Sequence, residues 1–158
     1  MENVDYGEAI EADIPALVSL VGILFGIEKD FRADVSKQKI GLELLLKNSQ
    51  TATVQVARNT TNQVIGMVSA QLVISTAQGA KSAWVEDMVI DSAYRSQGIG
   101  KQLLQNTLQW AKSKGATRAQ LLVDVENTEA LGYYHHLKWE TTQLQVRRVF
   151  LSDRINHK

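Results

Sequence analysis

The spacing of apolar residues changes at a pair of glycines past the middle of the chain. The run SAWVEDMVI (82–90) before them has the composition of a strand. After them, residues suited to packing recur at the spacing of one helical face, at Leu103, Leu104, Thr107, Leu108 and Ala111. Gly115 suits the position just after such a helix. Gly98 and Gly100 therefore mark a strand that leads through a loop into a helix, which predicts an α/β fold.

A helix start of this kind is suited to binding a phosphate, because its first N–H groups have no helical partner and carry the positive end of the helix dipole. A dinucleotide-binding fingerprint would need a third glycine where Leu103 stands. A phosphate-binding P-loop would need glycine in place of Arg95 and serine or threonine in place of Gln102. Both motifs are excluded. The glycines alone indicate either another phosphate-bearing ligand or an ordinary glycine-rich turn.

The rest of the chain continues the alternation of helices and strands. We expect a helix capped by Asp13, with Pro15 in its first turn, and a second, shorter helix capped by Ser36 that ends near Asn48. The further expected elements are a hairpin of strands at 51–58 and 63–75, a strand at 119–124, a helix at about 128–137 and one or two strands within 141–152. No repeat or linker interrupts this pattern, so we expect one domain, residues 1–158.

The composition limits the possible partners. Lysine and arginine number 17, as do aspartate and glutamate, in a chain of 158 residues, so no net charge attracts nucleic acid or an anionic membrane. The absence of cysteine excludes disulfides, zinc–thiolate sites and a cysteine acyl-enzyme. The acidic N-terminus is unlike a signal peptide, and no apolar run approaches the ~20 residues that span a bilayer. We expect a cytoplasmic protein with no metal, nucleic-acid or membrane partner.

Two motifs in the second half of the chain agree with those of one known family. RSQGIG (95–100) matches R/Q-x-x-G-x-G/A at every fixed place. The stretch VENTEALGYYHHLKWE (125–140) is similar to N-x-x-A-x-x-Y/F-Y-x-x-L-G-F, with matches at Asn127, Ala130, Tyr133, Tyr134, Leu137 and Trp139. Lys138 stands where the second motif has glycine. The chain thus resembles the GNAT superfamily of N-acetyltransferases over nearly its whole length.

The resemblance implies a GNAT-like fold, with a mixed central sheet of six to seven strands flanked by about four helices, and acetyl-CoA as co-substrate. It implies that the CoA pyrophosphate binds at Arg95, Ser96, Gln97, Gly98, Ile99, Gly100 and Lys101. The pantetheine arm would pair with the backbone of Met88, Val89 and Ile90, where the strands at 84–90 and 119–124 splay apart. Asn127 would also contact CoA.

Direct transfer to an amine needs a base that deprotonates the ammonium. Glu86 and Asp87 are the candidates. Neighbouring strand residues face opposite sides, so at most one points into the cleft unless a bulge re-aims the other. We favour Glu86, because the resemblance places a base two residues before the pantetheine-pairing segment. The alternative is that both acids make structural hydrogen bonds or ion pairs and that water is the base.

Tyr134 is the candidate general acid for the departing thiolate. Its phenol, with a reference pKa of about 10, is protonated at neutral pH, and family members use this tyrosine in that role. Asn127 and Tyr134 share one helical face, whereas Tyr133 is more simply a packed aromatic. The adjacent His135 and His136 point ~100° apart on a helix, so they do not form an i, i+4 metal pair.

The resemblance also implies that the acceptor enters beside the first helices and their loop. Candidates to guide a cationic amine there are Phe25, Glu28, Asp30, Phe31 and Asp34. We expect N-acetylation of a primary amine, with a small molecule favoured. Two alternatives stay open: a non-catalytic module that binds acyl-CoA as a sensor or regulatory subunit, and an acetyltransferase of proteins or peptides. Exposed late strands would allow a homodimer.

Overall fold

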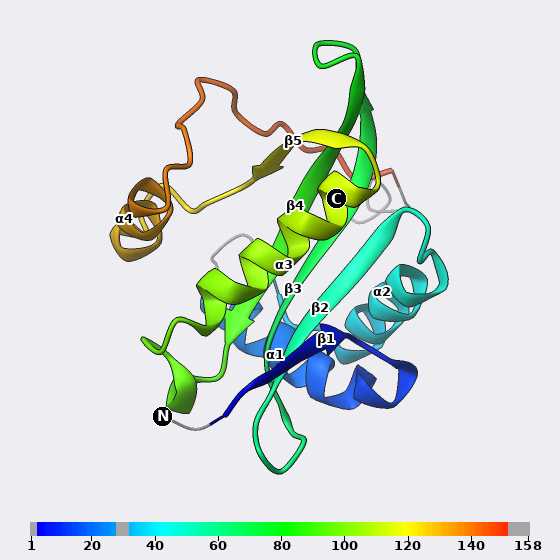
Figure 1. Cartoon of the computed structure of the whole chain (residues 1–158), viewed down its shortest axis with the longest axis vertical. Coiled ribbons are helices and arrows are strands. Elements are labelled where there is room, and N and C mark those ends of the chain that lie inside the picture. Colours follow the sequence, from blue (N-terminus) through cyan, green and yellow to red (C-terminus); the bar gives the residue numbers. More distant parts are fainter. Residues whose placement is uncertain (1–2, 28–31, 152–158) are drawn as a thin grey trace, which may run out of the picture. The chain divides into compact units, whose positions relative to one another are not determined.

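A computed structural model describes residues 3–27 and 32–151 (Figure 1). The chain forms two compact units, which divide after Leu122. No helix in the described parts of the chain combines the length and the apolar character needed to cross a membrane.

A five-stranded sheet forms the centre of the first unit (Figure 1). The strands stand in the order β1-β2-β3-β4-β5, with bounds Asp5–Glu8 (β1), Ala52–Arg58 (β2), Val64–Ser75 (β3), Ala80–Ile90 (β4) and Ala116–Leu121 (β5). β1 to β4 pair antiparallel, and β5 runs parallel to β4. A crossover must therefore join β4 to β5. The helices of this unit, the crossover α3 among them, are η1 (Glu11–Asp13), α1 (Ile14–Ile27), α2 (Val35–Lys47), η2 (Ser92–Tyr94) and α3 (Ile99–Ser113).

Helices cover both faces of the sheet. On one face the core joins α1 and α2 to the strands through Leu17, Leu20, Val21, Leu42, Val54, Val56, Met67 and Val89. Gly66, the neighbour of Met67, points to the opposite face because strand residues alternate. A Cβ at Gly66 would lie 3.3 Å from Leu103 Cδ1 of α3 and 2.8 Å from Ile90 Cδ1. The sheet is thus enclosed between α1 and α2 on one side and α3 on the other, and β2 is buried along nearly its whole length.

An ion pair connects the start of α1 to β2. Arg58 donates to both carboxylate oxygens of Asp13, with Nη1–Oδ1 at 2.7 Å and Nη2–Oδ2 at 2.6 Å. Asp13 also accepts a hydrogen bond from the backbone N–H of Ile10 at 2.8 Å. The bonds from Arg58 lower the pKa of Asp13, although burial opposes this effect. Asp13 was expected to cap α1, but it lies in the preceding turn η1, and its carboxylate is used in this ion pair.

We predict that Asp13→Asn lowers the free energy of unfolding at pH 7 by about 2 kcal/mol, because it leaves the half-buried guanidinium of Arg58 without this counter-ion. The folded-state pKa of Asp13 is depressed, so its contribution is present above the unfolded pKa of about 3.9 and is lost as the pH falls through the folded value. Urea unfolding across pH 2 to 7 should show the difference between wild type and variant shrinking in acid.

The control is Glu43→Gln, which removes the exposed pair of Lys39 Nζ with Glu43 Oε1 at 3.9 Å. Its effect should stay below about 0.5 kcal/mol. Equal effects of the two substitutions would contradict the structural importance of the Asp13–Arg58 pair.

The expected α/β fold is confirmed, but the described residues form a sheet of five strands and not six to seven. One or two strands were predicted within 141–152, but residues 141–151 form none: the alternation of apolar residues is present there, and no described strand pairs with the segment. β1 was not expected, since its residues DYGE have no apolar alternation, and pairing with β2 defines it. β5 begins earlier than expected, at Ala116.

The caps of α2 and α3 agree with the sequence prediction at the C-terminal ends of both helices but not at the start of α2. Asp34 and not Ser36 caps α2, because its carboxylate accepts the backbone N–H of Lys37 at 3.1 Å. The end of α2 at Lys47 agrees with the prediction. Gly115 has a φ of 94°, as expected for the residue after the end of α3.

The described residues of the second unit contain the helix α4 (Thr128–His136), close to the predicted 128–137. Asn127 caps it by accepting the N–H of Ala130 at 3.0 Å. At the other end, the N–H groups of Lys138 and Trp139 donate to the carbonyls of His135 and Tyr134, both at 3.0 Å. Lys138, which replaces the glycine of the motif, has a φ of 71°, so it takes the left-handed conformation that glycine usually supplies.

Candidate functional site

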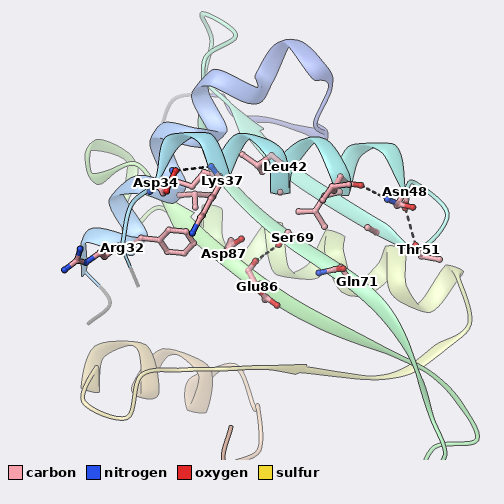
Figure 2. Close-up of a pocket in the computed structure, with 17 residues that line it drawn as sticks. Arg32, Asp34, Lys37, Leu42, Asn48, Thr51, Ser69, Gln71, Glu86 and Asp87 are labelled. Atoms are coloured by element: carbon pink, nitrogen blue, oxygen red, sulfur yellow. Dashed lines mark hydrogen bonds between the residues drawn. The ribbon is translucent and has the colours of Figure 1, made fainter. Parts of the chain in front are cut away.

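A pocket of about 670 Å³ lies between α1, α2 and the sheet (Figure 2). Its walls include residues of α1 (Val21, Phe25), of the loop that follows (Arg32, Asp34), of α2 (Lys37, Gln38, Leu42, Leu45), of β3 (Ser69, Gln71) and of β4 (Glu86, Asp87). The helices contribute most of the apolar surface and the strands contribute two acids. The volume is typical of small-molecule sites, which span ~300–1,000 Å³.

A β-bulge brings both candidate bases to this pocket. The pairs Ser69↔Glu86 and Met67↔Val89 enclose one more residue on β4 than on β3, and Asp87 has a φ of 55°. The hydroxyl of Ser69 donates to the backbone carbonyl of Glu86 at 3.1 Å. Strict alternation would send one acid to the far face of the sheet, but here Glu86 and Asp87 line the same pocket.

A tryptophan holds the carboxylate of Glu86. The indole N–H of Trp84 donates to Glu86 Oε1 at 2.6 Å, as the shared parity of the two residues on β4 allows. Glu86 is exposed, whereas Trp84 and Asp87 are half-buried. The Glu86 carboxylate is therefore oriented by a neighbour and still open to the pocket. The shared parity of Trp84 and Glu86 is visible in the sequence, but the bond between them is not, because parity does not specify a rotamer.

The strands β4 and β5 separate beside these acids. Their parallel register ends at Val85↔Leu121, whereas β4 continues to Ile90, where it pairs with Gly66 of β3. The strands at 84–90 and 119–124 were expected to splay apart, and the pairing of β4 with β5 ends after Val85. Met88, Val89 and Ile90, predicted to pair with pantetheine, form the end of β4 beyond this point.

Two residues of the glycine loop have a left-handed backbone conformation. Ser96 and Gly98 both have positive φ, 64° and 80°, and Gly98 is the residue that precedes α3. The amides of Ile99, Gly100 and Lys101 form the first turn of this helix, where no acidic side chain is present and N–H groups lack helical acceptors. Arg95 Nε donates to the carbonyl of Ile90 at 3.2 Å, which ties the loop to the end of β4. Gln97 is exposed.

The other two predicted residues, Asn127 and Tyr134, lie on the second unit. The side-chain oxygen of Asn127 accepts the cap hydrogen bond of α4, while its amide nitrogen carries two further donors. Burial, together with the neighbouring Tyr133, raises the pKa of Tyr134 to about 12. The Tyr134 ring packs edge-on against Tyr133 at 5.4 Å and against Trp139 at 5.9 Å between ring centroids. The phenol is thus protonated at neutral pH.

The expected acceptor region is described in part. Phe25 and Asp34 line the pocket. Glu28, Asp30 and Phe31 lie outside the described residues. Sequence analysis missed the polar pocket residues of α2 and β3, among them Lys37, Gln38 and Gln71. The sequence shows them only as polar residues on a helix and a strand, and it does not show that these two elements face the same pocket.

Comparison with known proteins identifies the family. A model of the acetyltransferase (GNAT) family matches residues 25–139, a stretch that includes the pocket acids, the glycine loop and α4. The chain belongs to the acetyltransferase (GNAT) family. An uncharacterized N-acetyltransferase of Methanocaldococcus jannaschii is 30% identical to this GNAT chain over 71 residues, which cover 45% of the chain and 31% of the relative. A glucosamine 6-phosphate N-acetyltransferase of Trypanosoma brucei brucei is 26% identical over 88 residues, 55% of the chain and 58% of the relative.

These alignments span less than two thirds of the length of either curated relative. Structural similarity covers more of the chain than these sequence alignments do. An aminoglycoside N-acetyltransferase solved in complex with CoA superposes with a TM-score of 0.77 at 17% identity, over 98% of this GNAT chain and 97% of that one.

We predict that Gly98→Ala lowers the free energy of unfolding by about 1 kcal/mol, because alanine is strained at a left-handed φ. The cause is conformational, since no atom lies within 4 Å of a Cβ built at Gly98. The control is Gly132→Ala within α4, where a Cβ also meets open space and helix propensity should stabilise the protein by about 0.5–1 kcal/mol. Thermal or urea unfolding measures both, and changes of the same sign would contradict the prediction.

Proposed function

We propose that this GNAT chain is an N-acetyltransferase that transfers the acetyl group of acetyl-CoA to a primary amine bound in the pocket. The observation that carries the proposal is that Glu86 and Asp87 line one pocket beside the separation of β4 and β5. A carboxylate there is suited to accept a proton from an ammonium group. The pocket has the size of a small-molecule site. By name, two similar proteins acetylate glucosamine 6-phosphate and aminoglycosides, which supports a small-molecule amine.

In this proposal the glycine loop and the start of α3 bind the CoA pyrophosphate. The groups assigned to it are the side chains of Arg95 and Lys101 and the backbone N–H groups from Ser96 to Lys101. The left-handed Ser96 and Gly98, and a first helical turn without acids, support this assignment. The pantetheine arm would pair with the backbone from Met88 to Ile90, and the amide nitrogen of Asn127 would contribute a further contact.

Acetyl-CoA supplies the acetyl group as a thioester, and the amine nitrogen bonds to its carbonyl carbon as the C–S bond breaks. Glu86 takes the proton that makes the incoming ammonium a neutral amine. Tyr134 donates its phenolic proton to the departing sulfur. The nitrogen gives up a second proton as the amide forms, and this proton, passed through solvent, restores the phenol of Tyr134. Burial raises the pKa of Tyr134 to about 12, so the phenol holds its proton at neutral pH.

Glu86 is proposed as the base, with Asp87 as the alternative. Trp84 orients the Glu86 carboxylate, and the exposure of Glu86 gives an entering amine access to it. We expect Glu86→Gln to lower kcat/KM by about 10²- to 10⁴-fold near neutral pH. Raising the pH should restore part of the rate, because more of the amine is then neutral. Asp87→Asn is the matched comparison, and a larger loss there, with the same recovery in base, would transfer the role to Asp87.

Tyr134→Phe should lower kcat by about 10²-fold or more, because the thiolate loses its proton donor. KM for acetyl-CoA should change little, since the ring stays in place. Tyr133→Phe is the control: it removes a buried hydroxyl that has no hydrogen-bond partner among the described residues and should leave kcat close to wild type. Single-turnover rates separate chemistry from product release. Full activity of Tyr134→Phe in the chemical step would overturn its assignment as the acid.

The proposal as a whole is tested by thiol release from acetyl-CoA across a panel of amines and peptides, with CoA binding measured in parallel by calorimetry. Acetylation of small amines supports it. Tight CoA binding without acetylation of any amine would favour a non-catalytic acyl-CoA-binding module. Activity on peptides alone would favour a protein or peptide acetyltransferase.

A further inference from the structure

Lys37 is a cation placed in the wall of the same pocket as the two acids. Figure 2 shows its side chain extending from α2 toward the strands that carry Glu86 and Asp87, whereas the guanidinium of Arg32 points away from the pocket. Glu86 and Asp87 come from β4, on the opposite wall. The strand side of the pocket thus carries Glu86 and Asp87, whereas the helix side carries the cation Lys37 together with Asp34 at the start of α2.

The backbone of Lys37 is held in place by the first turn of α2. Its N–H donates to the carboxylate of Asp34 at 3.1 Å. Gln38 accepts the N–H of Asp34 at 2.6 Å and donates to the carbonyl of Val18 on α1 at 3.0 Å. Gln38 is buried, so these bonds fix the start of α2 against α1. The base of the Lys37 side chain is thus positioned before any ligand arrives.

The ammonium of Lys37 is not committed to a structural role. Among the residues that the structure describes, its Nζ has neither a hydrogen bond nor an ion pair. A lysine two residues further along, Lys39, pairs with Glu43 on the surface of the same helix. Lys37 is exposed, and a lysine ammonium in a pocket wall that forms no ion pair with the described residues is suited to bind an anionic group of the ligand.

We propose that the acceptor is a small primary amine that also carries an anionic group, a carboxylate or a phosphate, which binds to Lys37 while the amine faces Glu86 and Asp87. This inference deepens the proposed function, on which it rests, by naming the class of the acceptor. The opposed charges would orient the ligand, so that its amine enters toward the acids. An amine without the anion would enter the pocket with no such preference.

The test compares amines in pairs that differ in one anionic group: O-phosphoethanolamine with ethanolamine, amino acids with their carboxamides, and amino sugar phosphates with the free amino sugars. Wild type should have the higher kcat/KM for the anionic member of a pair. Lys37→Gln should lower kcat/KM for that member by about ten- to hundredfold, the effect of losing one charged hydrogen bond. It should leave the other member nearly unchanged.

Lys39→Gln is the matched control, since it removes a lysine of the same helix that is 63% exposed and paired with Glu43. It should affect neither member of a pair. Comparison of the phosphate and carboxylate pairs identifies which anion is recognised.

Three results would overturn the inference while leaving the acetyltransferase intact: wild type prefers the amines without an anion, Lys37→Gln changes both members of a pair equally, or it changes neither. Failure of wild type to acetylate any amine of the panel would instead contradict the proposed function, and the inference with it. Circular dichroism and the unfolding midpoint of Lys37→Gln, compared with Lys39→Gln, separate loss of recognition from loss of structure.

Discussion

β4 carries one residue more than β3 between the pairs Ser69↔Glu86 and Met67↔Val89, and the candidate site depends on this insertion. An unbroken strand would point Glu86 and Asp87 to opposite faces, one toward α1 and α2 and the other toward α3. The bulge places both on the pocket side. Aspartate is well suited to it, because a short polar side chain tolerates the left-handed conformation better than most.

The location of the bulge matters as much as its presence. It follows directly after Val85, the last residue of β4 in register with β5. The bulge in β4 therefore lies where the pairing of β4 with β5 ends. In the proposed function, consecutive residues of this one strand would offer side chains for proton transfer and backbone for the pantetheine arm. Trp84, just before this point, fixes the orientation of Glu86.

The sequence predicted the elements whose signals are local side-chain patterns. The change from strand to helical spacing located β4, the glycine loop and α3, and Gly115 marked the end of that helix. α4 was predicted nearly to its bounds from its helical repeat, and the cap at Asn127, which the structure shows, accounts for its start. The family resemblance then assigned an acyl-CoA ligand that the glycines alone had left open.

The remaining features depend on contacts between distant segments. β1 exists through backbone pairing with β2, which leaves no side-chain signal. Asp34 and Ser36 are equally good caps by residue type, and the bond of Gln38 to Val18 on α1 favours the earlier start of α2. Asp13 has the residue type of a helix cap, but its carboxylate binds Arg58, a residue of β2 that is distant in the sequence. In the sequence analysis, a bulge was only the condition under which both acids would face the cleft. The bulge itself could not be predicted, because a strand sequence does not show where an extra residue is inserted.

The absence of a side chain at Gly66 determines how closely α3 packs against β3. Leu103 of α3 and Ile90 of β4 both lie where a side chain at this position would be. The helix α3 therefore packs through Leu103 and Ile99 onto a point of β3 that carries no side chain of its own. A side chain introduced there would press on both residues, and Ile99 is the first residue of α3, so the substitution would shift the start of this helix relative to the end of β4.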